Sequence, residues 1–318
     1  MNGAHPATAG MAPYLEGLLR SATGRGRYVY PLAPGPGLRK GVVNRILYYR
    51  GSFNPPHAGH LASLKHVVKH CGEDYNVVAI VVEMTHDEDL WLKFRGQPDA
   101  LLLTSHQRLL YWEEALLRDA DLRHRCWGIG GYDFCGWRSG FEGLVRESMA
   151  RSEFDVRVVH LAGGDYIRPD AYSMERFRGP TDYIISDISR QVEFQDAQER
   201  MFTLAGCEPW EKIFGIHQGA GVWSCRKRDH PAYTVRFVSA KEPMNPNPSS
   251  TAVQRAIKTS KPEALDENLR RSGALSHHLL AKQIGDRKEE KETRKKRAAE
   301  YAAYGNSMIS YLCSIRNW

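Results

Sequence analysis

Ten consecutive residues, GSFNPPHAGH from Gly51 to His60, combine two histidines with two prolines and two glycines. His57 and His60 are three positions apart, so a helix that begins near His57 carries both imidazoles on one face of its first turn. Unpaired backbone N–H groups and the helix dipole attract anions at that end of a helix. The segment therefore predicts a phosphate site in which the two histidines donate to phosphate oxygens and stabilise charge that develops on them.

The residues around the histidines fit the same kind of site. Arg45–Arg50 is rich in β-branched and aromatic residues and predicts a strand, which ends at Gly51. A glycine there allows a sharp turn, after which the amides of Ser52 and Phe53 can face a ligand. The two prolines delay the helix until just after them. We expect Gly59 to leave space for a phosphate.

This segment resembles the HxGH signature of the nucleotidylyltransferase superfamily, and its flanks are most similar to nicotinamide and nicotinate mononucleotide adenylyltransferases. The resemblance extends over roughly residues 45–260. It implies a Rossmann-like fold, ATP and a pyridine mononucleotide as substrates, and NAD or deamido-NAD with pyrophosphate as products. It also implies Mg²⁺ bound through the ATP phosphates, with no metal ligands assigned to the protein.

A second segment, NPSSTAVQR at Asn247–Arg255, resembles the ISSTxVR motif of the same superfamily. The resemblance implies a helix start that offers hydroxyls and amides to the outer phosphates. These groups belong to three adjacent residues, Ser249, Ser250 and Thr251.

The arginine of the second motif is displaced in this chain. The family's arginine falls on Gln254, and Arg255 follows about 100° further around an ideal helix. We expect a helix start shifted by one residue to bring Arg255 to the phosphates. A regular start would turn Arg255 aside.

A third segment, LAGGDY at Leu161–Tyr166, follows a predicted strand and is similar to the GxD turn of the family. The resemblance implies that Gly164 lets the backbone approach the nucleotide and that Asp165 accepts hydrogen bonds from ribose hydroxyls. A simple β-turn is the alternative interpretation.

Four residues are candidates for binding the acceptor nucleotide. Lys93 and the SHQR stretch that ends at Arg108 resemble the family segment near the acceptor phosphate. Trp127 and Trp137, in and beside the glycine-rich stretch 128–143, are candidates to stack on the acceptor base. Surface positions for Arg108 and core positions for the tryptophans remain open.

No other chemistry is favoured. His66 and His70 have a spacing that a metal could use, but Lys65 and Lys69 would repel a cation, which favours a solvated face. The six cysteines form no C-x-x-C pair, which argues against a zinc site and favours a reducing compartment. A Walker A loop and a G-x-S-x-G elbow are both absent.

Predicted strands alternate with predicted helices, which is typical of an α/β domain with a parallel sheet flanked by helices. Ligands bind such sheets at the carboxyl ends of the strands, where the strand order reverses. The predicted strands are Arg45–Arg50, Asn76–Val82, Asp155–Leu161, Asp182–Ile188 and Tyr233–Ser239, and the helices are Leu61–His70, Ser105–Arg118 and Ser250–Thr259.

We expect a single main domain over residues 41–285. Residues 1–40, rich in Ala, Gly and Pro, predict a flexible tail, with a mitochondrial targeting segment as the alternative. Residues 286–318 predict a charged helical extension, whose RKKR run could also be a nuclear signal.

The net charge of +7 over 318 residues suggests acidic partners such as phosphorylated small molecules. Scattered basic residues without a nucleic-acid module argue against nucleic acid, and no apolar run is long enough for a membrane span. We expect a cytoplasmic or nuclear protein; no feature indicates its oligomeric state. Two other functions stay open: the same fold with a phosphopantetheine or phosphocholine acceptor, or a weakly active or inactive paralogue that binds or hydrolyses ATP.

Overall fold

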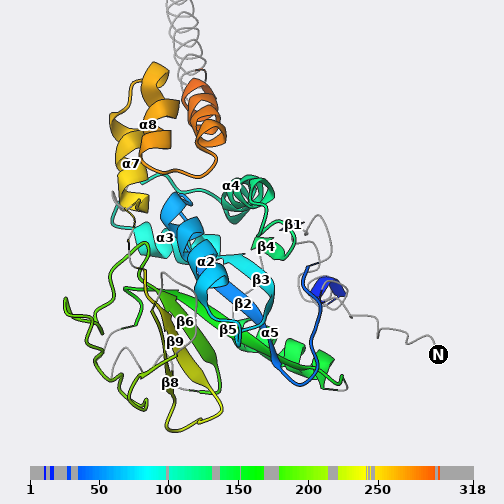
Figure 1. The fold of residues 1–318 in the computed structure, drawn as a ribbon. Helices are drawn as coiled ribbons and strands as arrows, with labels where there is room; N and C mark the ends of the chain where they lie inside the picture. Colours follow the sequence, from blue (N-terminus) through cyan, green and yellow to red (C-terminus); the bar gives the residue numbers. More distant parts are fainter. Residues whose placement is uncertain are drawn as a thin grey trace, which may run out of the picture.

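A single sheet organises the computed structural model. It describes residues 11, 15–17, 27–29, 35–97, 100–130, 137–150, 152–167, 179–213, 221–240, 242, 244, 248–290 and 293. The nine strands of these residues follow the order β1-β4-β3-β2-β5-β6-β9-β8-β7 (Figure 1). Their bounds are β1 Arg27–Val29, β2 Val43–Gly51, β3 Val77–Met84, β4 Cys126–Gly130, β5 Asp155–Gly163, β6 Asp182–Ser186, β7 Glu211–Lys212, β8 Val222–Arg226 and β9 Thr234–Val238.

The strands from β4 to β9 in that order are parallel, and antiparallel strands extend the sheet at both edges. The helices are α2 Ala58–His70, α3 Asp87–Phe94, α4 Ser105–Arg118, α5 Trp137–Met149, α7 Ser250–Thr259 and α8 Leu265–Arg271. The predicted α/β class, a Rossmann-like parallel sheet flanked by helices, is confirmed.

Helices cover both faces of the sheet. α2 and α4 contribute Leu64 and Trp112 to one core cluster, and α5 contributes Phe141 to a second cluster on the other face. β2 divides its side chains between the two clusters by alternation, with Leu47 in the first and Ile46 in the second. β3 is buried along its whole length, which explains why its sequence is apolar apart from Glu83.

Two elements near the site differ from the sequence-based expectation. β4 was not predicted, because its sequence CWGIG contains glycines, which disfavour strands. A Cβ at Gly130 would lie 3.1 Å from the carbonyl oxygen of Ser105, so a glycine here permits the close approach of α4. α3 was also not predicted, because its sequence DEDLWLKF is short and acidic.

The described parts of residues 1–40 do not form a free tail, which corrects the prediction. β1 pairs antiparallel with β4. Met11, Leu15 and Leu38 are buried in the cluster on the α5 side. These isolated apolar residues cover core surface, although the Ala, Gly and Pro around them suggested a flexible segment.

At the other end, a helix runs through residues 277–290 and crosses the predicted boundary at residue 286. Leu280 and Ile284 of this helix pack with α7, α8 and Tyr111 of α4 in a separate cluster. Figure 1 shows α7, α8 and this helix together beyond one end of the sheet. The rest of the predicted extension, apart from residue 293, lies outside the described residues.

Among the described residues, no helix is long and apolar enough to cross a membrane.

Candidate functional site

The predicted site residues lie where the strand order reverses. After β2 the chain passes through α2 to β3 on one side of β2, and later returns to β5 on the other side. The carboxyl ends of β2 and β5 are therefore the switch point, the place where α/β sheets bind ligands. The HxGH segment follows β2 at this point, and the GGD turn follows β5.

The two histidines of the first motif lie against each other at the start of α2. His57 is the N-cap, and its ring stacks on that of His60 with centroids 3.6 Å apart. The backbone N–H of His57 donates to Nδ1 of His60 over 3.2 Å. Because Nδ1 accepts this bond, Nε2 carries the proton of the neutral ring and can donate to a ligand. The prediction that helix α2 begins just after the two prolines is confirmed.

Phe53 packs against the ring of His60. Its ring meets the ring of His60 edge-on, with centroids 4.9 Å apart. Its backbone has a φ of 42°, a region that non-glycine residues rarely adopt. A Cβ at Gly51 would lie 2.7 Å from the Phe53 ring, so the glycine is needed for this packing. Gly51 and Phe53 thus hold His60 in place.

Burial keeps both imidazoles neutral in the ligand-free protein. Desolvation, followed by the charge of Arg190, lowers the pKa of His57 to about 4. Desolvation also lowers the pKa of His60 well below its usual range, and His57, Arg190 and Lys93 add to the effect. Both rings are therefore neutral near pH 7, and each carries one N–H.

This shift predicts acid sensitivity of folding. Between pH 6.5 and about 4 the unfolded chain binds a proton at His57 while the folded chain does not. The free energy of unfolding therefore decreases as the pH is lowered through this range. One pKa unit corresponds to about 1.4 kcal/mol, so this group costs on the order of 3 kcal/mol at pH 4. Urea unfolding at pH 7 and pH 4.5 should show a smaller loss for His57→Asn than for the unchanged protein. Exposed His106→Asn is the control, and an equal loss in all three proteins would contradict the shift.

The second motif packs directly on the first. Ser249 caps α7 by accepting from the backbone N–H of Ala252 over 3.1 Å. The hydroxyl of Ser250 donates to the carbonyl of Pro55 over 3.2 Å. A Cβ at Gly59 would lie 3.1 Å from the carbonyl oxygen of Pro248. Gly59 therefore leaves room for the second motif, and the N-termini of α2 and α7 converge beside the histidines. Thr251, the next residue of α7, is exposed.

The expected shift of the second helix is wrong. α7 begins regularly at Ser250. Gln254 faces inward, where its amide donates to the carbonyl of Leu101 over 2.9 Å and accepts from the N–H of Leu101 over 3.0 Å. Arg255 is exposed, and among the described residues its side chain has no hydrogen bond or ion pair with the two phosphate motifs. Because the start is regular, the helix turns Arg255 aside.

This register predicts opposite outcomes at two adjacent positions. Gln254→Ala removes both hydrogen bonds with Leu101 and should lower the free energy of unfolding by about 1–3 kcal/mol. Arg255→Ala should change it by less than about 0.5 kcal/mol and leave ATP kinetics unchanged. Urea unfolding and steady-state kinetics test both variants. A tenfold rise in the KM for ATP in Arg255→Ala would restore the shifted register.

Two exposed cations flank the histidines. Lys93 on α3 donates to the hydroxyl of Ser52 over 3.2 Å, so it reaches the first motif. Arg190, in the loop after β6, pairs with the carboxylate of Asp165. A Cβ at Gly164 would collide with the carbonyl of Arg190, so Gly164 is needed for the packing of these two loops. The turn at Gly163–Asp165 thus lies beside the loop that carries Arg190.

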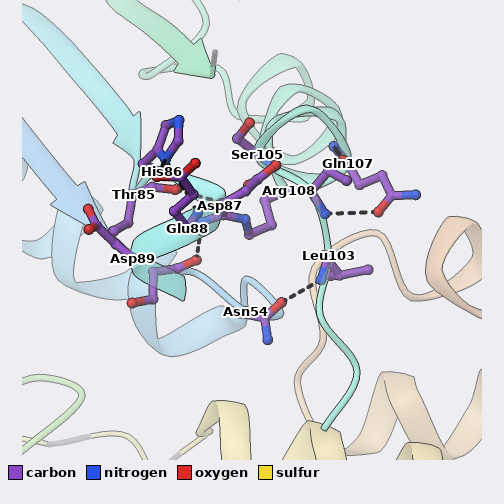
Figure 2. A network of polar contacts seen from close by, with 12 residues as sticks. Asn54, Thr85, His86, Asp87, Glu88, Asp89, Leu103, Ser105, Gln107 and Arg108 are labelled. Atoms are coloured by element: carbon purple, nitrogen blue, oxygen red, sulfur yellow. Dashed lines mark hydrogen bonds and ion pairs between the residues drawn. The ribbon is translucent and has the colours of Figure 1, made fainter. Parts of the chain in front are cut away.

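Arg108 is not placed to bind an acceptor phosphate, which corrects the prediction. Its side chain is fully buried. The guanidinium donates to the carbonyls of Ser52 and Thr85, both over 2.6 Å, and to Asp87 over 2.7 Å. Asp87 also accepts from the N–H of Ser105 over 2.6 Å, and Figure 2 shows Asp87 between α4 and the turn after β3. Arg108 therefore joins the ends of β2 and β3 to α4.

Of the two candidate tryptophans, only Trp127 has a described side chain. Trp127 lies in β4 with 1% of its surface exposed, packed in the core cluster on the α5 side. Its ring is covered by core side chains, so this structure favours a core role over stacking on a base. Trp137 is the first residue of α5, and its side chain lies outside the described residues.

His66 and His70 lie one turn apart on α2, with ring centroids 4.8 Å apart. They line a cavity of about 580 Å³ together with Lys65, Lys69 and Arg125. Within the described part of the chain, no group of three or more His, Cys, Asp or Glu side chains could hold a metal ion. Lys65 and Lys69 are exposed, but burial lowers the pKa of His66 to about 4, and a ring nitrogen of each histidine is buried. The solvated face expected from the sequence therefore holds for the lysines and is wrong for the histidines.

Sequence reasoning missed two residues at the site. Arg190 is separated by 25 positions from Asp165, and only the pairing of β5 with β6 brings their loops together. Asn54 joins the first motif to the segment before α4, because its side chain donates to the carbonyl of Leu101 over 2.8 Å and accepts from the N–H of Leu103 over 3.0 Å. Figure 2 shows the bond to Leu103. The Asn-Pro-Pro string is a local signal for such a turn, whereas Arg190 has none.

Comparison with known families agrees with the geometry. Residues 48–128, about a quarter of the chain, match the model of a family described as cytidylyltransferase-like. This stretch runs from within β2 into β4 and contains the HxGH segment, Lys93 and Arg108. A comparison with curated proteins finds no match. The match supports nucleotidyl transfer in general and does not select the nucleotide or the acceptor.

Proposed function

We propose that the protein transfers the AMP portion of ATP to nicotinamide or nicotinate mononucleotide. The observation that carries the proposal is the convergence of two helix N-termini on one pair of neutral imidazoles at the switch point of the sheet. Such an arrangement offers donors aimed at a group of linked phosphates. The GSFNPPHAGHL string supports a pyridine mononucleotide as the acceptor through its resemblance to that family.

The reaction needs no general base in this site. The acceptor phosphate is already an anion near neutral pH, and it attacks the α-phosphorus of ATP as pyrophosphate leaves. In the proposal, the Nε2–H of His60 and the His57 ring hold the α- and β-phosphates. The amides at the starts of α2 and α7 meet the remaining phosphate charge, and Asp165 accepts from the ribose hydroxyls. Catalysis then rests on positioning and charge stabilisation.

Mg²⁺ belongs to the proposal as an ion carried by the nucleotide. The donors that this site directs at phosphates are N–H groups and cations, which fits a metal held by phosphate and water. Bound in that way, Mg²⁺ neutralises charge on the triphosphate.

On the acceptor side, Lys93 is the described candidate for the mononucleotide phosphate. Its position on α3 next to Ser52 places an ammonium group beside the first motif. Arg108 acts through the backbone of Ser52 and not through the ligand. Trp137 remains the candidate for stacking on the acceptor base.

Two other functions remain as proposals. A CTP-dependent transfer to phosphocholine, or ATP-dependent transfer to phosphopantetheine, fits the same site, because the matched family is described only as cytidylyltransferase-like. A slow or inactive paralogue fits the loss of the arginine that the family motif places at Gln254.

One panel of assays separates these functions. ATP and CTP are each combined with nicotinamide mononucleotide, nicotinate mononucleotide, phosphocholine and phosphopantetheine in the presence of Mg²⁺, and pyrophosphate release is followed. The proposal expects release only with ATP and a pyridine mononucleotide. Release with CTP and phosphocholine would replace the proposed substrates, and ATP hydrolysis without any acceptor dependence would support the paralogue.

A further inference from the structure

Arg190 is held firmly beside the histidine pair by its backbone. The hydroxyl of the preceding Ser189 lies 2.7 Å from that of Ser63 on α2. Ser63 in turn donates to the carbonyl of Gly59 over 3.0 Å. On the other side, the carbonyl of Arg190 rests against Gly164. The loop after β6 is therefore fixed between the first turns of α2 and the GGD turn.

The side chain of Arg190 remains exposed while its backbone is fixed. Its side chain is 54% exposed and pairs with that of Asp165, which is 52% exposed. Its positive charge lies close enough to lower the pKa of both His57 and His60. A cation therefore lies close to the histidine pair.

The site lacks the cation that the second motif would have supplied. Gln254 uses its side chain to bind Leu101, and Arg255 is turned aside. A triphosphate still carries several negative charges, and a guanidinium matches phosphate oxygens better than an ammonium because it donates two parallel hydrogen bonds.

We propose that Arg190 supplies the phosphate-binding guanidinium of this site, from the loop after β6 instead of from α7. Asp165 holds Arg190 beside the site in the ligand-free protein. When a nucleotide binds, its ribose hydroxyls donate to the Asp165 carboxylate and displace Arg190. The guanidinium of Arg190 then binds the β- and γ-phosphates. An exposed ion pair of this kind contributes little free energy, so its exchange for phosphate contacts costs little. This inference rests on the proposed function, because it assumes a nucleoside triphosphate in the site.

Equilibrium titration of the full chain with ATP and with AMP, both with Mg²⁺, tests this role. Arg190→Ala should raise the Kd for ATP at least tenfold and the Kd for AMP less than threefold, since AMP lacks the outer phosphates. The Kd of Arg190→Lys for ATP should lie between the values for the unchanged protein and for Arg190→Ala. Arg200→Ala is the matched control, because Arg200 is an exposed arginine in the same segment between β6 and β7 and pairs with Asp196. It should leave both Kd values unchanged.

The outcomes separate this inference from the proposed function. An unchanged Kd for ATP in Arg190→Ala, or an equal loss for ATP and AMP, overturns the role of Arg190 and leaves the proposed reaction intact. An unchanged protein that binds ATP but forms no dinucleotide overturns the proposed reaction, and the ATP-to-AMP comparison still decides the role of Arg190. If the unchanged protein binds neither nucleotide, both are wrong.

Discussion

His60→Ala should lower kcat for dinucleotide formation at least about a hundredfold, the scale of losing one donor to a charge that develops in the transition state. The reason is geometric: Nδ1 of His60 is occupied by the N–H of His57, so Nε2–H is the donor that remains for the substrate. Steady-state kinetics with ATP and the preferred mononucleotide measure the loss. The KM for ATP should change much less than kcat, because the donor acts mainly in the transition state.

A stability measurement and a control variant distinguish a loss of catalysis from a loss of folding in His60→Ala. His60 also packs against Phe53, so His60→Ala needs a thermal unfolding measurement beside the kinetics. His278→Ala, at an exposed position of the helix over residues 277–290, should retain full turnover. A folded His60→Ala protein with nearly normal kcat would remove His60 from the reaction.

Arg108→Met should lower the free energy of unfolding by about 1–3 kcal/mol, the scale of leaving buried acceptors without a donor. The loss of the ion pair adds little, because the Asp87 side chain is 36% exposed and water can solvate it. The substitution leaves Asp87 without its ion pair and the carbonyls of Ser52 and Thr85 without their donor. Urea unfolding measures the loss. Arg118→Met on the same helix is the matched control, because Arg118 is 67% exposed and pairs with Glu114 at the surface.

The same variant decides between two roles for Arg108. A structural role predicts loss of stability and a loss of activity that follows it. A rise in the KM for the mononucleotide with unchanged stability would instead restore the acceptor-binding role that the sequence suggested.

The parallel strands could be predicted because β2, β3, β5, β6 and β9 have dense β-branched or apolar sequences. β4 could not, because its glycines are explained only by the close packing of α4 on Gly130. β1 could not either, because three residues gain strand geometry only by pairing with β4. Local sequence therefore predicted the centre of the sheet, and long-range contacts determine its edges.

The site residues also fall into those with a local sequence signal and those placed by long-range contacts. The HxGH and SST segments were recognisable because each depends on a local helix start. Arg108 was misassigned because its burial depends on packing, although one signal was present: it is four positions before Trp112 and eight before Leu116, on the apolar face of α4. The place of Arg190 beside Asp165 depends on the pairing of β5 and β6 and had no local signal.

The central claim, nucleotidyl transfer at the histidine pair, is tested most directly by identifying the products of ATP and a pyridine mononucleotide. Pyrophosphate and dinucleotide are quantified together over one time course with Mg²⁺. The account predicts equal amounts of the two products and the loss of both in His60→Ala. Formation of ADP and phosphate without dinucleotide, or ATP binding without any product, would contradict it.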